Sequence, residues 1–136
     1  MDKLLQMMGL ARRANLLLAG EEVVADAIAA HKARLVLLAA DASERTGKKT
    51  RQMAGEKLPV LVLPVDKDAL GAALGKGSCA VAAVLDGGFA AKLAQMLAQG
   101  NPDYAAVAER LDQKEAKRQR RKKEKTRTRK KSWDRG

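Results

Sequence analysis

The chain has 136 residues, which is enough for one compact domain with an appendage and too few for two ordinary domains. Apolar residues make up 46% of the sequence and aromatic residues only 2%, so the core must consist of aliphatic side chains. The single cysteine, Cys79, excludes an intrachain disulfide, and no Cys or His cluster has the spacing of a structural zinc site. We therefore expect no metal and no cofactor.

Positive charge is concentrated near the C-terminus. Residues 1–113 contain 14 basic and 13 acidic residues, which gives a net charge of +1. Residues 114–131 contain 12 basic and 2 acidic residues, which gives a net charge of +10. No segment reaches the roughly 18 apolar residues of a membrane span, and the N-terminus lacks the apolar region of a signal peptide. These features predict a soluble, cytoplasmic protein without a membrane partner.

The apolar spacing predicts that helices and strands alternate along the chain. In chain order, the predicted elements are helix 2–14, strand 16–19, helix 21–31, strand 34–40, helix 41–57, a short strand within 58–65, helix 66–74, loop 75–78, strand 79–85 and helix 87–99. This alternation favours an α/β fold, specifically a three-layer α/β/α sandwich with a mixed sheet of about four strands.

The pattern also predicts details of these elements. The strands at 34–40 and 58–65 are continuous apolar runs, which indicates that helices cover both of their faces. Asp41 and Glu44 have the spacing of a capping box at the start of the third helix. In the last helix of the domain, the helical period places four side chains in the core: Phe89, Leu93, Met96 and Leu97.

The globular domain is predicted to span residues 1–100, and residues 101–136 are predicted to form a basic tail. The run "GNPD" at 100–103 breaks the preceding helix. After Leu111 only Trp133 is able to bury much apolar area, so the tail cannot offset the entropy of ordering itself. We expect this tail to be helical or disordered, as a charged helix that frays.

Catalytic motifs receive no support from the sequence. The loop "GKGS" at 75–78 lacks the Ser or Thr that follows the lysine of a nucleotide-binding P-loop, and a strand follows it instead of a helix. The candidate nucleophiles and bases show no triad spacing. They are His31, Cys79, Asp41 and Ser43. The sequence therefore predicts a protein that is not an enzyme.

The basic tail is interpreted as an arm that binds a polyanion, the alternative being a solubilising extension. Its density of cations exceeds what solubility needs, and it lacks the apolar face of a membrane-surface helix. Phosphate contacts of this kind supply affinity without sequence choice. The predicted phosphate-binding residues are Lys117, Arg118, Arg120, Arg121, Lys122, Lys123, Lys125, Arg127, Arg129, Lys130 and Lys131.

Three runs, "GEEVVADAI…ARLVLLAADAS", "LGAALGK" and "VAAVLDGGFAAKL", resemble the ribosomal protein L7Ae/L30e family, in particular its small bacterial YlxQ-like branch. The resemblance implies an α/β/α domain that binds kink-turn RNA, a sharply bent duplex with tandem sheared G·A pairs. It also implies that the turn after the first strand and the loop before the last strand contact RNA. Here those residues are Gly20, Glu21, Glu22, Val23 and Asp26, together with Gly75, Lys76, Gly77 and Ser78.

The turn at Gly20 departs from the family pattern. The strongest RNA binders of the family have Gly-Thr-Asn-Glu here and a lysine three residues later, so only the glycine matches and Asp26 replaces a cation. Glu21 and Glu22 are favoured by the dipole at a helix N-terminus, and carboxylates there repel phosphate while accepting hydrogen bonds from base edges. Either they read bases or they only stabilise the start of the helix.

We interpret the chain as a non-enzymatic, ribosome-associated RNA-binding protein and expect it to be a monomer. Its core recognises structured RNA through loops, backbone and polar edges, because it lacks the exposed aromatic platforms on which bases stack. Two alternatives remain. One is a non-specific nucleic-acid binder in which only the tail makes contact, and the other is a protein-interaction module of the same fold.

Overall fold

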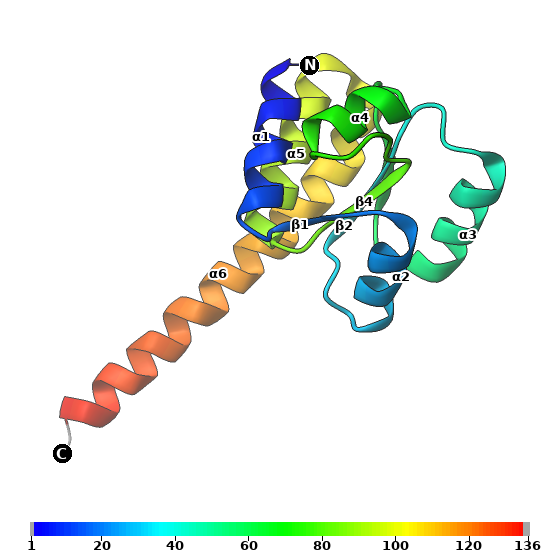
Figure 1. Ribbon diagram of the computed structural model, residues 1–136. Helices are drawn as coiled ribbons and strands as arrows, with labels where there is room; N and C mark the ends of the chain where they lie inside the picture. Colours follow the sequence, from blue (N-terminus) through cyan, green and yellow to red (C-terminus); the bar gives the residue numbers. More distant parts are fainter. Residues whose placement is uncertain (1, 135–136) are drawn as a thin grey trace.

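The computed structural model describes the backbone of residues 2–134 and the side chains of residues 2–125 (Figure 1). Helices and strands alternate in the predicted order. In chain order they are α1 (Asp2–Arg13), β1 (Leu17–Ala19), α2 (Glu21–Ala29), β2 (Leu35–Leu38), α3 (Glu44–Ala54), β3 (Val60–Val62), α4 (Lys67–Ala73), β4 (Val81–Val84), α5 (Gly87–Gly100), a 3-10 turn (Pro102–Tyr104) and α6 (Ala105–Asp134).

The strands form one mixed sheet in the order β1-β4-β2-β3. β4 runs antiparallel to β1 and β2, whereas β2 and β3 are parallel. Leu38 pairs with Val81 at one end of the sheet, which we call the loop end, and Leu35 pairs with Val84 at the other, which we call the tail end. The predicted four-stranded mixed sheet is thus confirmed.

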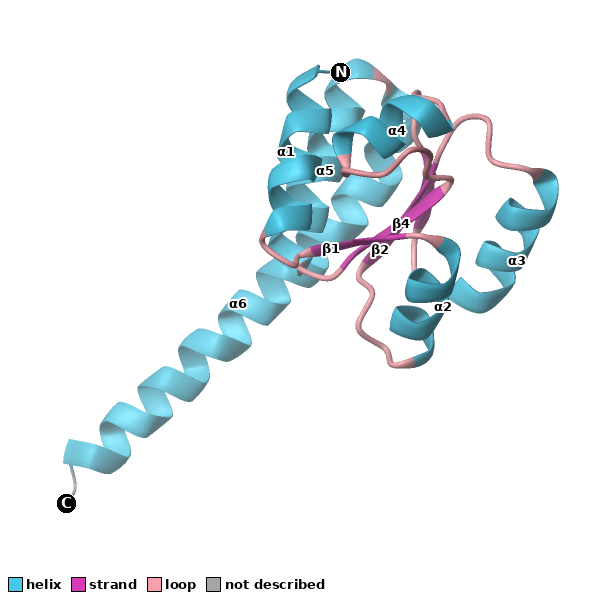
Figure 2. Ribbon diagram, in the orientation of Figure 1, coloured by secondary structure: helices cyan, strands magenta, loops and turns pink. Residues whose placement is uncertain are grey.

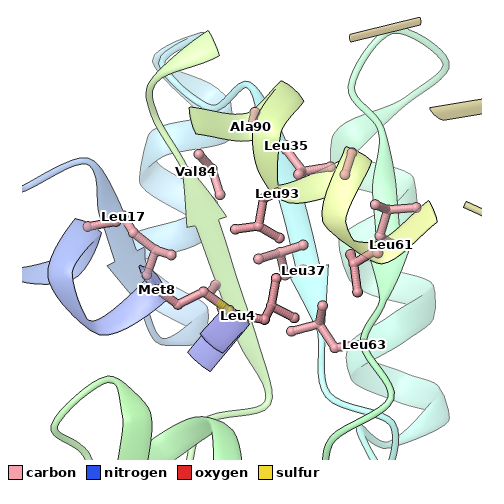
Figure 3. Packing of buried hydrophobic residues seen from close by; sticks show 14 of the residues in the cluster. Leu4, Met8, Leu17, Leu35, Leu37, Leu61, Leu63, Val84, Ala90 and Leu93 are labelled. Carbon is pink, nitrogen blue, oxygen red and sulfur yellow. The ribbon is translucent and has the colours of Figure 1, made fainter. Parts of the chain in front are cut away.

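Helices cover both faces of this sheet (Figure 2). On one face, Leu35 and Leu37 belong to a large aliphatic cluster shared with α1, α4, α5 and the first turns of α6 (Figure 3). On the other face, Val36 and Leu38 pack with Val24 of α2. Consecutive residues of β2 therefore point to opposite layers, as the two-residue period of a strand requires. The predicted α/β/α sandwich is confirmed.

The predicted capping box at Asp41 is wrong. Ser43 caps α3, because its Oγ accepts a hydrogen bond from the Thr46 N–H at 3.1 Å. The chain leaves β2 through a turn, and the carboxylate of Asp41 there accepts the N–H of Lys67 at 2.7 Å. Asp41 therefore links the end of β2 to the start of α4, an arrangement that local spacing does not reveal.

Two expectations about the core need correction. The strand within 58–65 is not covered on both faces along its length, since β3 is an edge strand and Val62 is 40% exposed. In α5, Leu93 and Leu97 are buried as predicted, but Phe89 and Met96 are only partly buried at the margin of the core. Both errors arise because apolar spacing does not show where the sheet ends or a layer stops.

The helix predicted over 21–31 ends at Ala29. His31 adopts a left-handed backbone with φ 57°, and the Lys32 N–H donates to the Ala27 carbonyl at 2.9 Å. These are features of a Schellman motif, which closes a helix and turns the chain away from its axis. The turn directs the chain back toward β2.

α6 continues from the domain and extends away from it (Figure 1). Ala108 and Leu111 of its first turns are buried in the core, and the Glu115 carboxylate lies against Gly87 at the start of α5. Because Gly87 follows β4, the helix leaves the domain at the tail end. Its 30 residues correspond to about 45 Å at ~1.5 Å per residue. Neither α6 nor any other helix of the described residues is both long and apolar enough to cross a membrane.

Replacing Leu37 by alanine tests the packing of the central strand. Leu37 is fully buried, so Leu37→Ala leaves a cavity and should lower the free energy of unfolding by about 2–5 kcal/mol. Leu10→Ala is the matched control, because Leu10 is 62% exposed and its loss should change the free energy by about 0.5 kcal/mol or less. Urea denaturation followed by circular dichroism measures both, and equal effects would contradict the described core.

Candidate nucleic-acid interface

Gly20 forms the turn between β1 and α2, and its backbone conformation explains the glycine. Its φ of 117° lies in a region that other residues rarely adopt. Its N–H donates to the Val81 carbonyl at 3.0 Å, which fixes the turn to the start of β4. No side chain caps α2, so the first N–H groups of this helix lack a side-chain acceptor.

The loop at 75–78 lies against this turn. A Cβ placed on Gly20 would lie 3.2 Å from the Nζ of Lys76. The structure therefore brings together the two segments that the sequence singled out, although more than fifty residues separate them in the chain. The loop residues are exposed, and so are Glu21, Glu22, Val23 and Asp26 on α2.

α4 holds the loop in position. The Lys76 N–H donates to the Gly71 carbonyl at 2.7 Å, and the Cys79 N–H donates to the Lys67 carbonyl at 3.0 Å. A Cβ on Gly71 would lie 2.7 Å from the Cα of Ser78, so a glycine is needed for α4 to pack this closely on the loop. The position of Lys76 is consequently set by backbone contacts.

The two glutamates at the start of α2 have different surroundings. Glu21 accepts a hydrogen bond from the Thr46 hydroxyl at 2.6 Å, and Thr46 lies in the first turn of α3. Glu22 has no hydrogen-bonded or ion-paired partner in the part of the chain whose side chains are described. Glu21 therefore positions α2 against α3, and Glu22 is the carboxylate that is free to accept donors from a ligand.

A cleft of about 400 Å³ lies beside this turn, between α2 and α3. Glu22 and Asp26 line it from α2, and Thr46 and Lys49 line it from α3. Lys49 places a positive charge in the same cleft as Asp26, the position at which the family pattern has a lysine. Donors, acceptors and both signs of charge thus meet in one cleft.

Cys79 ends the loop and is buried. Its thiol donates to the Val81 carbonyl at 3.2 Å, and burial raises the pKa of the thiol above its ordinary value. The backbone hydrogen bond with Val81 and the positive charges of Lys76 and Arg12 act in the opposite direction on this pKa. Cys79 is therefore a packing residue in the thiol form.

Two residues of this surface were not found from the sequence: Thr46 and Lys49. Both come from α3, and only the tertiary fold brings them beside the turn at Gly20. The Ser43 cap followed by Thr46 was a usable local signal for the start of α3, but nothing local indicates that Thr46 reaches Glu21.

The four candidate catalytic residues are not brought together. His31 lies at the tail end, whereas Cys79 lies at the loop end; Ser43 caps α3 and Asp41 binds the Lys67 N–H. Within the described side chains, no group of three His, Cys, Asp or Glu is placed to hold a metal ion. These four residues therefore do not form one site.

The predicted phosphate-binding residues of the tail lie on α6. Those with described side chains are exposed, namely Lys117, Arg118, Arg120, Arg121, Lys122, Lys123 and Lys125. Arg118 forms an ion pair with Glu115 at 3.0 Å, and this hydrogen bond lowers the pKa of Glu115 below its ordinary value. The side chains of Arg127, Arg129, Lys130 and Lys131, and of Trp133, lie outside the described residues.

Comparison with known proteins gives consistent matches. The family model described as "Ribosomal protein L7Ae/L30e/S12e/Gadd45 family" matches residues 2–94. A relative from Bacillus subtilis, named "RNA-binding protein YlxQ", is 39% identical over 92 residues, which cover 67% of this chain and 91% of the relative. The family match includes both the turn at Gly20 and the loop at 75–78 and ends before α6.

Solved structures share the fold. A protein of unknown function from Bacillus halodurans is 41% identical with a TM-score of 0.64, and the match covers 70% of this chain and 96% of that one. The 15.5kD RNA binding protein of Giardia lamblia is 20% identical with a TM-score of 0.56, over 81% of this chain and 88% of that one. At that identity the second likeness shows the fold alone.

Two glycine-to-alanine substitutions should have effects of opposite sign. Gly20→Ala forces an L side chain into a left-handed backbone beside Lys76 and should lower the free energy of unfolding by about 1–3 kcal/mol. Gly47→Ala, inside α3 with its nearest neighbour 3.9 Å away, should raise it by about 0.5–1 kcal/mol. Thermal and urea denaturation of both variants measure this, and a stabilising Gly20→Ala would contradict the described turn.

Proposed function

Because the chain belongs to the ribosomal protein L7Ae/L30e/S12e/Gadd45 family, we propose that it is a non-enzymatic, ribosome-associated protein that binds structured, kink-turn-like RNA. In this proposal the α/β/α domain recognises the RNA in the cytoplasm as a monomer, and α6 holds its phosphates. The name of the Bacillus subtilis relative, an RNA-binding protein, supports the RNA-binding part. The observation that carries the proposal is the contact of Lys76 with Gly20, which makes one surface of two distant segments.

The chemistry of this surface suits base edges more than phosphates. The exposed carboxylate of Glu22 accepts hydrogen bonds from amino and imino groups, and its charge repels phosphate. Lys76 and Lys49 supply cations on either side of the turn at Gly20. A bent RNA presents base edges and backbone to one surface at the same time, which a straight duplex does not do in the same geometry. In this proposal the groups at the loop end therefore recognise both the bend of the RNA and the edges of its bases.

α6 is placed to bind a different part of the same RNA. It leaves the domain at the tail end, whereas the turn at Gly20 and the loop at 75–78 are at the loop end. Its exposed cations supply affinity that does not depend on sequence. An RNA that uses both surfaces must extend from one end of the domain to the other.

Truncation after Gln119 separates recognition from affinity. It removes most cations of α6 but keeps the contacts of Leu111 and Glu115 that anchor the helix. The slope of log Kd against log salt should fall by about 0.7–0.9 for each phosphate that the shortened helix no longer neutralises, while the preference for a kinked RNA over a plain duplex stays. Fluorescence anisotropy at several salt concentrations measures both quantities.

Substitutions at single lysines provide the matched control for this experiment. Lys76→Gln should abolish the preference for the kinked RNA, whereas Lys92→Gln, an equal charge change on the exposed side of α5, should keep it. If the truncated protein binds kinked and straight RNA alike, the protein is a non-specific binder. If the truncated protein binds neither, the full chain decides the outcome. Binding by the full chain means that only the tail makes contact, and no binding means that the domain is a protein-interaction module.

Asp26→Lys tests whether α2 faces RNA. The substitution restores the cation of the family pattern within the cleft and should tighten binding of kinked RNA by about tenfold or more through a charge-assisted contact. Asp103→Lys makes the same charge change at an exposed position of the 3-10 turn and serves as control. Equal effects of the two variants in a binding titration would show only a general effect of charge and would remove α2 from the interface.

A further inference from the structure

A second cavity, of about 740 Å³, lies at the tail end, opposite the turn at Gly20. The segments after α2 and α3 form two of its walls, and the third wall is α6 between Leu111 and Arg118. Gly87, at the start of α5, also lines it. None of the residues that the family resemblance assigns to RNA lies in this cavity.

Basic side chains from three elements line the cavity. Arg34 precedes β2, Lys57 follows α3, and Lys114 and Arg118 come from α6. The two acidic residues of the lining are Glu56 and Glu115, and Glu115 is already paired with Arg118.

The other cations have no ion pair of their own within the described side chains, although the charge of Arg34 also lowers the pKa of Glu115. The side chains of Arg34 and Lys57 have no hydrogen-bonded or ion-paired partner within the described side chains. Lys114 donates only to the backbone carbonyl of Lys57, at 3.2 Å. The cavity therefore contains more positive than negative charge.

The fold holds the segments that carry these cations against one another. Arg110 donates to the carbonyls of Glu56 and Lys57 at 3.0 and 2.9 Å, which ties α6 to the segment after α3. Burial lowers the pKa of Lys114, and the positive charges of Arg110, Arg34 and Lys57 lower it further. Like charges gathered in one cavity repel one another, and a bound anion removes this repulsion.

We propose that this cavity binds a phosphate group, with Arg34, Lys57 and Lys114 as its donors. A guanidinium and two ammonium groups on separate walls can surround a tetrahedral anion with several oxygens, and the planar guanidinium fork fits two phosphate oxygens at once. The cavity is continuous with the exposed cations of α6, so an RNA phosphate is the source that fits best. The assignment of the anion to an RNA phosphate rests on the proposed function, whereas the phosphate site itself does not.

The experiment uses the full chain, labelled with ¹⁵N, and titrates it with inorganic phosphate at constant ionic strength. Saturable shifts are expected at the backbone amides of 33–34, 55–58 and 114–118, and sodium acetate at the same ionic strength should not reproduce them. The double variant Arg34→Gln/Lys114→Gln should weaken phosphate binding by about tenfold or more. Lys117→Gln is the control for the single variant Lys114→Gln, because it loses the same charge three residues along α6 but outside the cavity lining, and it should leave phosphate binding unchanged.

A second arm identifies the source of the phosphate. Addition of a kinked RNA should displace inorganic phosphate from the cavity of the wild-type protein, which supports an RNA phosphate. Saturable binding that RNA does not displace supports the same site with free phosphate as its ligand. The single variants Arg34→Gln and Lys114→Gln, checked by circular dichroism, keep the test valid if the double variant does not fold.

Three results would overturn the proposed site. They are the absence of saturable shifts around the cavity, equal shifts with acetate, and equal weakening by Lys117→Gln. Each leaves the RNA preference attributed to Lys76 and Gly20 untouched, because those residues lie at the loop end. Conversely, loss of RNA preference with phosphate binding intact would contradict the proposed function alone.

Discussion

The pairing of β4 with both β1 and β2 is the constraint on which the candidate interface and the position of α6 depend. At the loop end, Val81 accepts the N–H of Gly20, and the segment that leads into β4 is therefore held against the β1–α2 turn. At the tail end, the chain leaves β4 and enters α5 at Gly87, on which Glu115 of α6 rests. The four residues of β4 thus lie between the candidate interface at the loop end and the start of α5 at the tail end. At ~3.3 Å per residue, they separate these two surfaces by about 13 Å.

Much of the fold was predictable from the sequence because continuous apolar runs and helical apolar spacing leave a clear pattern. The run at 34–40 places alternate residues on two apolar faces, and β2 is indeed a strand whose four residues are all buried. The predictions were wrong where the contact that decides the structure joins residues far apart in the sequence. Asp41 has a local capping pattern, but its carboxylate binds the Lys67 N–H instead. The spacing around Val62 shows an apolar strand, yet only the assembled sheet shows that this strand lies at the edge.

The candidate interface was predictable in its segments and not in its details. The family resemblance indicated the turn at Gly20 and the loop at 75–78, and the structure places Lys76 against that glycine. No pattern in the sequence distinguishes Glu21 from Glu22, because the difference is a hydrogen bond from Thr46 on another helix. The same holds for Lys49, which shares a cleft with Asp26 only after α3 packs beside α2.

The near-neutral charge of the domain conceals an uneven local distribution: exposed carboxylates lie near Lys76 and Lys49 at the loop end, and four basic and two acidic residues line the cavity at the tail end. Carboxylates are exposed near the loop end, at Glu22 and Asp26, whereas Arg34 and Lys57 line the cavity at the tail end. α6 starts beside that cavity and continues it as a row of exposed cations. On the proposed function, an RNA docks with base edges at the loop end and phosphates at the tail end. Because α6 is anchored through Leu111 and Glu115, the direction of its axis relative to the domain is set by the core.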